Sequence, residues 1–363
     1  MRARFETRLR VGRRTISQDQ PAFIVAEAAC NHMCRMDLAR RMVDRAAAAG
    51  ADAIKFQSYK AERLVRGSAV SFWQDQKVSQ LEYYRRLDKF GPEEYRELFD
   101  RARKRGIVGF STPFDCGTAT MLDRLGMPVF KIASCDLPDH RFLRHVARFG
   151  KPVFLSLGAS TPDEIDAAVS AVLGTGNRKL ALLACTLSYP TKDADAHLRR
   201  IETLRQRYPG AVIGLSDHTE PDERMVIPAL AVALGARIVE KHYTLDRSMK
   251  GSGHAFAVDP PCLAAMTANI RLAETVLGSG ELRVHQAERL ARQRARRSIV
   301  AERSIRKGEV LTGDMLGVKR PADGLPPSRM DSVVGRTAMR DIPADAPIRL
   351  EWLGPRRAAS RRP

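Results

Sequence analysis

The chain has 363 residues, enough to bury one large core and to add a small second domain. It contains no uninterrupted apolar run of about 20 residues, which a membrane-spanning helix requires. The N-terminal stretch MRARFETRLRVGRRT lacks the apolar segment of a secretory signal. We therefore expect a cytoplasmic protein that does not enter a membrane.

The formal net charge is +19, which raises the possibility of a polyanion-binding protein. Much of this charge lies in residues 1–14, 287–297 and 355–363, and the sequence has no basic motif studded with aromatic residues. We expect solvated basic tails that help to attract an anionic substrate, and not a dedicated nucleic-acid function.

The six cysteines are scattered and do not show the paired spacing of a zinc site, which predicts reduced thiols. The segment CNHMC at residues 30–34 permits a soft-metal site. Without a distant partner pair, buried small side chains are the better interpretation.

Eight short apolar runs alternate with amphipathic stretches between residues 21 and 278. The amphipathic stretches are typical of helices: 36–50 ends at Gly50, and 161–174 begins with Thr161 as N-cap and Pro162 as first residue. Eight such units predict a closed (β/α)8 TIM barrel. The alternative, an open doubly wound sheet, normally has a glycine-rich first turn, and this chain has ACNHMC there. The predicted strands are 22–28, 53–58, 107–112, 128–134, 152–158, 180–186, 211–217 and 236–242.

The composition divides the chain into five segments. Residues 1–20 form a basic N-terminal extension, 21–280 the barrel, and 281–297 a basic linker. Residues 298–353 form a small, turn-rich, mostly β domain with strand-like runs at 298–305, 310–321 and 346–353, and a basic tail follows at 354–363. Within the barrel, residues 62–91 exceed an ordinary connection and are predicted to form a lid or substrate loop.

Polar side chains gather at the predicted carboxyl ends of the strands, where barrel enzymes place their chemistry. Strand periodicity puts Lys55 with Gln57, Ser216 with His218, and Glu240 with His242 on common faces. Lysines with nearby hydroxyls suit the binding of a phosphate dianion. Ordinary salt bridges at the mouth of the barrel would explain Lys55 and Lys131 equally well. Lys131 and Ser134 are an odd number of residues apart, so a regular strand would place their side chains on opposite faces. Both can face the site only if the chain bends near Ala133. The set comprises Glu27, Lys55, Gln57, Ser111, Thr112, Lys131, Ser134, Ser156, Thr186, Ser216, His218, Glu240 and His242.

His218 and His242 end neighbouring strands of such a barrel. Imidazoles with oxygen ligands suit a first-row divalent ion such as Mn²⁺, with positions left open for water or substrate. A single buried histidine is more often a hydrogen-bonded core residue. Two on neighbouring strand ends, with Glu27 and Glu240 as possible nearby carboxylates, favour a metal site.

Several segments of the chain resemble successive blocks of one known family. The blocks are IVAEAACNH, AGADAIKFQSYKAERLV, FSTPFD, LGMPVFKIASCDL, GKPVFLSLGAST, IGLSDHT, ALGARIVEKHYTLD and KGSGHAFAVDP. They are similar to the sialic acid synthase family, the N-acetylneuraminate and other nonulosonic acid synthases. The segments SIVAERSIRKGEVLTGDMLGVKRPADGLPP and VVGRTAMRDIPADAPI resemble the SAF (antifreeze-like) domain that ends those enzymes.

This resemblance implies a transferase that condenses phosphoenolpyruvate with an open-chain 2-acetamido or diacetamido hexose such as N-acetylmannosamine. The products would be a nonulosonic acid and phosphate. A domain-exchanged homodimer is implied as well, and Mn²⁺ as the cofactor with Mg²⁺ or Co²⁺ as alternatives. By this resemblance Glu27, His218 and His242 are catalytic, and the two histidines hold the metal. Phosphoenolpyruvate is held by Lys55, Thr112, Lys131, Ser134 and Ser216, and the sugar by Gln57, Asp136, Tyr189 and Arg320.

Three positions depart from the family pattern. Gly253 stands where aspartate is typical, Leu187 where asparagine or serine is usual, and Asp136 where many members have glutamate. The acceptor sugar is the property that these departures affect most, and Gly253→Asp is expected to improve the use of N-acetylmannosamine.

Three other functions are weighed against this one. A related 3-deoxy-aldulosonate synthase would need extra basic residues for a sugar phosphate, and a metal-dependent hydrolase would need His-x-His after the first strand. The non-enzymatic alternative is a polyanion-binding scaffold that works through its tails. It predicts that deleting residues 1–14 and 354–363 abolishes function, whereas the synthase predicts little change in turnover.

Overall fold

The computed structural model describes residues 5–70, 78–251 and 253–356. The chain divides into two compact units, Met1–Gly278 and Ser279–Pro363. In the described part of the chain, no helix has both the length and the apolar character needed to cross a membrane. All six cysteines are free.

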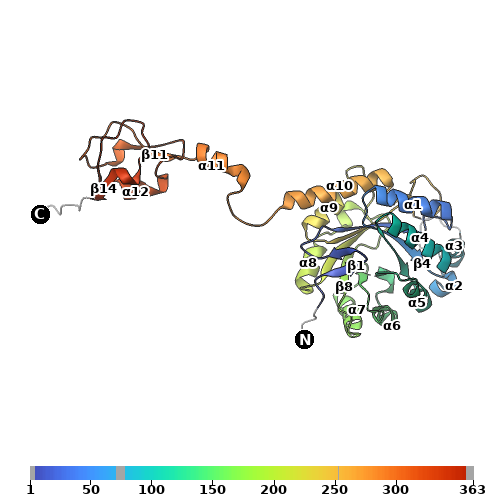
Figure 1. The fold of residues 1–363 in the computed structure, drawn as a ribbon. Coiled ribbons are helices and arrows are strands. Elements are labelled where there is room, and N and C mark those ends of the chain that lie inside the picture. The colour runs from blue at the N-terminus through green and yellow to red at the C-terminus, as the bar shows by residue number, and fades with distance from the viewer. Residues whose placement is uncertain (1–4, 71–77, 252, 357–363) are drawn as a thin grey trace. The chain divides into compact units, whose positions relative to one another are not determined.

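The first unit is a nearly closed (β/α)8 barrel, as predicted, with its helices around the outside of the strands (Figure 1). Its eight strands pair in parallel in the order β5-β4-β3-β10-β9-β8-β7-β6, and β5 and β6 at the two ends of this order lie against each other. The strands are β3 (Phe23–Ala29), β4 (Ala53–Ser58), β5 (Val108–Pro113), β6 (Phe130–Ile132), β7 (Val153–Ser156), β8 (Leu180–Cys185), β9 (Val212–Asp217) and β10 (Ile238–His242).

A helix follows each barrel strand, which completes the eight predicted units. Local signals fix their ends: Thr161 caps its helix by accepting a hydrogen bond from the Glu164 amide, and Pro162 is the first helical residue. The helices are α1 (Met36–Ala48), α4 (Pro92–Lys104), α5 (Cys116–Arg124), α6 (His140–Ala147), α7 (Pro162–Leu173), α8 (Arg200–Arg207), α9 (Val226–Ala233) and α10 (Pro260–Leu277).

Side chains from alternate strands fill the barrel interior. Phe154 of β7 packs edge-on against Phe23 of β3 and Phe110 of β5, with ring centroids 6.3 and 6.1 Å apart. All three rings are buried. Because inward positions recur every second residue, the next positions toward the carboxyl ends of β5 and β7 are Thr112 and Ser156. The interior therefore changes from aromatic to polar toward the rim where the strands end.

The N-terminal extension is a structured part of the barrel unit. An antiparallel hairpin of β1 (Leu9–Val11) and β2 (Arg14–Ile16) buries Leu9, Val11 and Ile16 in the barrel core. The expectation of a solvated tail is wrong for this segment, since the arginines between these apolar residues conceal a two-residue alternation. Residues 1–4 lie outside the described part.

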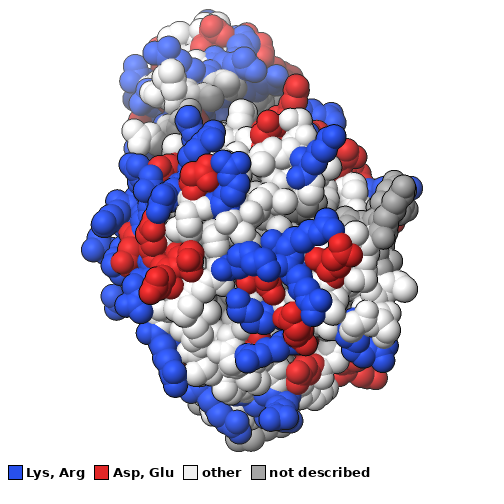
Figure 2. Space-filling model, turned by 90° about the vertical axis from the view of Figure 1, so that its right-hand side faces the viewer, with Lys and Arg blue, Asp and Glu red and all other residues white. Residues whose placement is uncertain are grey.

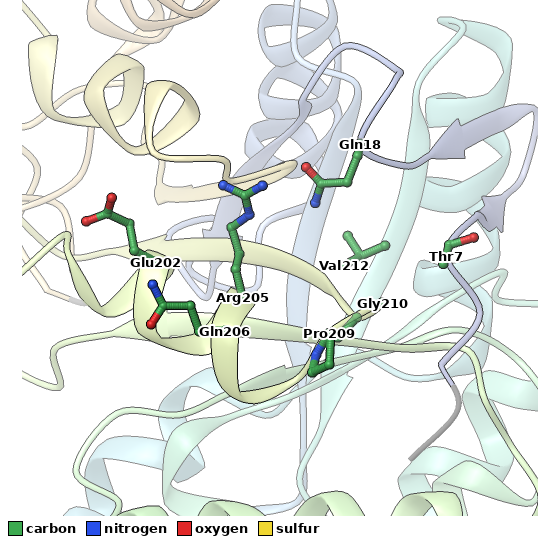
Figure 3. Close-up of a pocket in the computed structure, with 9 residues that line it drawn as sticks. Thr7, Gln18, Glu202, Arg205, Gln206, Pro209, Gly210 and Val212 are labelled. Carbon is green, nitrogen blue, oxygen red and sulfur yellow. The ribbon is translucent and has the colours of Figure 1, made fainter. Parts of the chain in front are cut away.

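The hairpin covers the amino ends of the strands. Arg14 forms an ion pair with Asp52, which precedes β4, and the Arg237 guanidinium, ahead of β10, donates to the Gln18 carbonyl. A surface pocket of about 490 Å³ lies beside the hairpin, lined by Thr7, Gln18, α8 and the turn before β9 (Figure 3). Because it adjoins the start of β9, this pocket is at the opposite end of the barrel from the polar rim.

The long insertion after β4 contains α2 (Ala61–Leu64) and α3 (Gln80–Leu87). Leu87 and the two tyrosines of α3 pack with Cys30 and Tyr59, which follow β3 and β4, in a small apolar cluster. The insertion therefore lies over the carboxyl ends of these strands. Residues 71–77 of the predicted lid lie outside the described part.

The second unit has its own apolar core, which includes Ile299, Leu311 and Ile348. The exposed helix α11 (Arg289–Ala295) precedes β11 (Ser298–Ala301), which pairs with β12 (Leu316–Lys319); β13 (Arg336–Ala338) pairs with β14 (Leu353–Arg356), and α12 (Met330–Val333) lies between the pairs. Two predicted strand-like runs are wrong in part. In 310–321, residues 313–315 form a 3-10 helix and the strand is confined to β12, and in 346–353, residues 350–352 form a 3-10 helix and β14 starts at Leu353. Residues 357–363 of the basic tail are not described.

Basic and acidic side chains are interspersed on the face of the molecule shown in Figure 2. Many surface arginines form ion pairs, such as Arg40 with Glu97, and both Arg101 and Arg105 with Asp44. Local pairing of this kind limits how far the net charge can act as a continuous polyanion-binding surface.

Candidate active site

Lys55 lies at the centre of a buried charge cluster inside the rim of the barrel. Its Nζ forms an ion pair with Glu27 of β3, donates to Thr112 Oγ1 of β5 over 2.8 Å, and lies 3.7 Å from Glu240 Oε1 of β10. All four side chains are almost inaccessible to solvent. The strand pairings β3-β4-β5 and β10-β3 bring these residues together.

Lys131 reaches the same cluster from the opposite wall, and Ser134 lies beside Gly158 after β7. Lys131 Nζ lies 3.4 Å from Glu240 Oε1, and Ser216 Oγ donates to the same oxygen over 3.1 Å. Strand β6 stops at Ile132, Ala133 is extended, and Ser134 begins a 3-10 helix in which its hydroxyl accepts the Gly158 amide. The bend that the parity of Lys131 and Ser134 requires is therefore present.

Burial and neighbouring charge separate the pKa values of the two carboxyl groups. Burial raises the pKa of Glu27 to about 7, and Lys55 only partly opposes this shift. Burial also acts against ionisation of Glu240, but Lys131 and Lys55 outweigh it and lower the pKa of that group. Near neutral pH the cluster therefore holds an ionised Glu240 and a Glu27 that can gain or lose a proton.

The two histidines at the rim face each other. His218 follows β9 and His242 ends β10, with ring centroids 5.3 Å apart. His218 Nδ1 lies 2.8 Å from the Thr186 carbonyl, a partner that makes Nδ1 the protonated nitrogen and leaves Nε2 free to bind a ligand. Burial lowers the pKa of His218 to about 4 and that of His242 well below its usual value. Both rings are therefore neutral at pH 7, as metal ligation requires.

The donor set at this rim fits a divalent metal that has open positions. His242 Nδ1 is buried without a hydrogen-bond partner, which is costly unless some group occupies it. Among the residues that the structure describes, no three His, Cys, Asp or Glu side chains gather closely enough to hold a metal by themselves. A metal here would have two imidazole ligands and would take the others from water or substrate.

Aromatic rings surround the two imidazoles. Tyr189, after β8, packs against His218 with centroids 4.2 Å apart and against His242 at 5.6 Å. Phe256, after β10, lies 5.2 Å from the His242 ring and 5.3 Å from that of Tyr189. Aromatic rings from the segments after β8 and β10 thus pack against the two imidazoles.

The other predicted sugar-binding residues lie in different places. Gln57 is half-buried on β4, and Asp136 is half-buried in the 3-10 helix after β6. Burial, with help from Asp139, raises the pKa of Asp136 to about 7. Arg320 is exposed directly after β12 in the second unit, so the barrel unit itself does not contain it.

Two of the three departures from the family pattern have local structural consequences. A Cβ atom at Gly253 would lie 2.5 Å from Phe256 Cζ, and one at Gly158 would lie 3.2 Å from Leu187 Cβ. Gly253 therefore leaves room for an aromatic ring, and Leu187 packs beside the glycine whose amide binds Ser134.

Glu240, which its parity with His242 predicts as a nearby carboxylate, lies in the buried charge cluster. Two further residues beside the two histidines are not predicted from the sequence. Cys185 ends β8 with its Sγ 3.8 Å from His218 Nδ1, but its apolar run does not indicate this. Phe256 lies in the loop after β10, whose path no periodicity predicts.

The fold and the rim together define a (β/α)8-barrel enzyme with a buried cluster of lysines, carboxylates and hydroxyls beside two neutral imidazoles. The chain belongs to the NeuB family, whose model matches residues 42–282, and a SAF domain model matches residues 296–353. The resemblance to the nonulosonic acid synthases is thereby confirmed.

Individual relatives extend this likeness over almost the whole chain. An uncharacterised protein of Methanocaldococcus jannaschii is 39% identical over 93% of this chain and 96% of its own. The N,N'-diacetyllegionaminic acid synthase of Campylobacter jejuni is 32% identical over 90% of this chain and 98% of its own. Among solved structures, the N-acetylneuraminic acid synthetase of Leptospira borgpetersenii in complex with citrate is 36% identical, with a TM-score of 0.71 over 79% of this chain and 96% of that one.

Proposed function

We propose that this protein condenses phosphoenolpyruvate with an open-chain 2-acetamido or diacetamido hexose to give a nonulosonic acid and phosphate. The observation that carries the proposal is the placement of Lys55 and Lys131, with the hydroxyls of Thr112 and Ser216, beside two neutral imidazoles. An anionic donor and a carbonyl acceptor can then bind next to each other.

Charge balance supports phosphoenolpyruvate as the ligand of the cluster. Two lysines facing two ionised carboxylates would have no net charge to attract an anion. Because the pKa of Glu27 is about 7, that carboxyl can be protonated near neutral pH, and the cluster then has a net positive charge. Ammonium groups and hydroxyl donors together satisfy phosphate oxygens.

The reaction forms one carbon–carbon bond and one carbon–oxygen bond to water, and it breaks the carbon–oxygen bond to phosphate. The methylene carbon of phosphoenolpyruvate attacks the aldehyde carbon, whose oxygen takes up a proton and becomes a hydroxyl. The second carbon of phosphoenolpyruvate then becomes cationic. The ionised form of Glu27 stabilises that cation and can accept the proton of the water that adds to it. The resulting phosphohemiketal releases phosphate and leaves the 2-keto acid.

We propose Mn²⁺ as the cofactor held by His218 and His242, with Mg²⁺ and Co²⁺ as alternatives. Bound there, the ion would supply Lewis-acid polarisation of the acceptor aldehyde. The protein's own contribution is two imidazoles kept neutral by burial and, for His218, oriented by the Thr186 carbonyl. Gln57, Asp136 and Tyr189 are proposed to contact the sugar.

A homodimer with Arg320 reaching the site of the second subunit is part of the proposal. Helices α9 and α10 pack on each other and expose Leu230 and Val276, with 50% and 75% of their surface accessible. Exposed apolar residues on paired helices are typical of an interface. The location proposed for the enzyme is the cytoplasm.

The experiment that tests the function is phosphate release from phosphoenolpyruvate with a panel of 2-acetamido and diacetamido hexoses, with chelator or with added Mn²⁺. We expect release that depends on both an acceptor and a metal. Absence of acceptor-stimulated release at every metal concentration would refute the function. Adding phosphorylated sugars to the panel tests the aldulosonate synthase alternative.

A further inference from the structure

Gly253 and Phe256 form a coupled pair beside the two histidines. A Cβ atom at Gly253 would lie 2.5, 3.0 and 3.2 Å from three atoms of the Phe256 ring. The ring of Phe256 therefore occupies the space that any side chain at residue 253 would need.

The backbone around Gly253 is held in place. The Gly253 amide donates to Asn31 Oδ1 over 3.0 Å, and Asn31 Nδ2 donates to the Tyr243 carbonyl over 2.9 Å. The next residue, His254, is buried with Nδ1 2.7 Å from Thr244 Oγ1. Since these bonds hold Gly253 and His254, and the near atoms all belong to the Phe256 ring, a side chain at residue 253 requires that ring to move.

The position of the ring relative to the site decides what it can do. Phe256 is half-buried and packs on His242 and Tyr189. In the proposed function, His242 helps to hold the metal that polarises the aldehyde, and Tyr189 contacts the sugar. A hydroxyl group pressed against a phenyl ring loses its hydrogen bond to water and gains no partner. A methyl or deoxygenated carbon at the same point gains apolar contact.

We infer that Phe256, in the space left open by Gly253, is a specificity-determining residue that selects an acceptor with a deoxygenated carbon where it meets this ring. The inference rests on the function proposed above and adds a substrate class to it. The cognate acceptor is an acetamido sugar that lacks one of the hydroxyls of N-acetylmannosamine.

The kinetic test compares N-acetylmannosamine with its 4-deoxy and 6-deoxy analogues in phosphate release. For the unmodified protein, we expect kcat/KM for one deoxy analogue to exceed that for N-acetylmannosamine by about tenfold, within the range that one hydroxyl contributes in an apolar pocket. Phe256→Ala should reduce this ratio mainly through KM of the deoxy sugar, and Gly253→Asp with Phe256→Ala should invert it. Phe149→Ala, which removes a ring that packs on Phe130, is the matched control and should leave the ratio unchanged.

A separate measurement tests the steric coupling without turnover. Gly253→Ala adds only the Cβ atom and should lower Tm by about 4 °C in the unmodified protein, but by much less in the Phe256→Ala background. Equal shifts in both backgrounds would overturn the coupling. Phosphate release with a ratio that Phe256→Ala does not change would overturn the inference and leave the proposed function standing. Absence of release with every acceptor would refute the proposed function and, with it, the inference.

Discussion

Lys55 and Glu27 form an ion pair inside the barrel, where 2% and 1% of their surfaces are accessible to solvent. A buried pair of this kind is held by mutual attraction that must offset the loss of hydration of both groups. A second carboxylate, Glu240, also forms an ion pair with Lys55 and a further one with Lys131. The removal of one charge therefore affects the others.

The first prediction concerns this cluster. Lys55→Met leaves the two glutamates with a single lysine, and we expect the free energy of unfolding to fall by about 3–5 kcal/mol. The double variant Glu27→Gln with Lys55→Met should recover most of this loss, because no unpaired charge remains. Urea unfolding of the single and double variants at pH 7 measures both effects.

Activity separates the two roles of the cluster. Both variants should lose phosphate release, because the double variant recovers stability but lacks both the charge proposed to hold phosphoenolpyruvate and the carboxyl proposed to stabilise the cation. A double variant that regains turnover together with stability would show that neither Lys55 nor Glu27 takes part in the reaction.

The barrel could be predicted from the sequence because its signals are local. Eight apolar runs separated by capped helices specify the strand count, and the start of the helix at Pro162 is encoded by Thr161 and Glu164. The polar rim follows from the same pattern. Lys55 lies between the apolar Ile54 and Phe56, and parallel strands bring their carboxyl ends to one edge.

The parts that were missed depend on contacts between distant segments. The hairpin at residues 9–16 is basic in composition, and only its packing on the amino ends of the strands makes Val11 a core residue. The ring of Phe256 lies near His242 through the path of an irregular loop. The path of that loop has no periodicity in the sequence, and the two-residue alternation of the hairpin is concealed by its arginines.

The second prediction follows from the N-terminal hairpin. Deletion of residues 1–14 removes β1 and its buried side chains, and we expect it to destabilise the barrel instead of leaving turnover unchanged. Val11→Ala alone should cost about 1–3 kcal/mol, because the side chain is inaccessible to solvent. Thermal unfolding measures the loss, and Arg13→Ala, at an exposed position of the same hairpin, is the control.

The outcome for the deletion distinguishes a structural segment from a polyanion-binding tail. The deletion variant should bind polyanions about as weakly as the full chain once folded, but should unfold at a lower temperature. Unchanged Tm after deletion of residues 1–14 would mean that the hairpin adds nothing to the barrel.

The third prediction concerns the two imidazoles. His218→Asn and His242→Asn each remove one of the two proposed protein ligands, and we expect Mn²⁺ affinity to fall by more than about tenfold. Titration calorimetry of the protein treated with chelator and then dialysed measures this affinity independently of turnover. His285→Asn, in the exposed segment before α11, is the control.

Two results would contradict the metal site. Wild-type affinity for Mn²⁺ in the His242→Asn variant would exclude that ring as a ligand. Acceptor-dependent phosphate release that continues at full rate with excess chelator would show that the reaction needs no exchangeable metal.

The fourth prediction is a pH dependence from Asp136. Burial first, and then Asp139, raises its pKa to about 7 in the folded protein, from an ordinary value of 3.8. At pH values between these two pKa values, Asp136 keeps its proton in the folded protein but has lost it in the unfolded chain. The resulting stabilisation is fully present below about pH 4 and is lost as the pH rises through 7.

Asp136→Asn keeps the shape of the side chain and removes this titration. We expect the stability of the variant, relative to the unmodified protein, to rise by about 2 kcal/mol between pH 5 and pH 8. Urea unfolding at several pH values measures the difference. Asp163→Asn, at an exposed position of α7, is the control, and it gives the change in unfolding free energy with pH when a carboxyl outside the site is removed. Parallel curves for Asp136→Asn and the unmodified protein would mean that Asp136 is ionised in the folded protein throughout this range. In that case it would bring a full negative charge to the sugar at neutral pH, whereas a protonated Asp136 can donate a hydrogen bond to an acetamido oxygen.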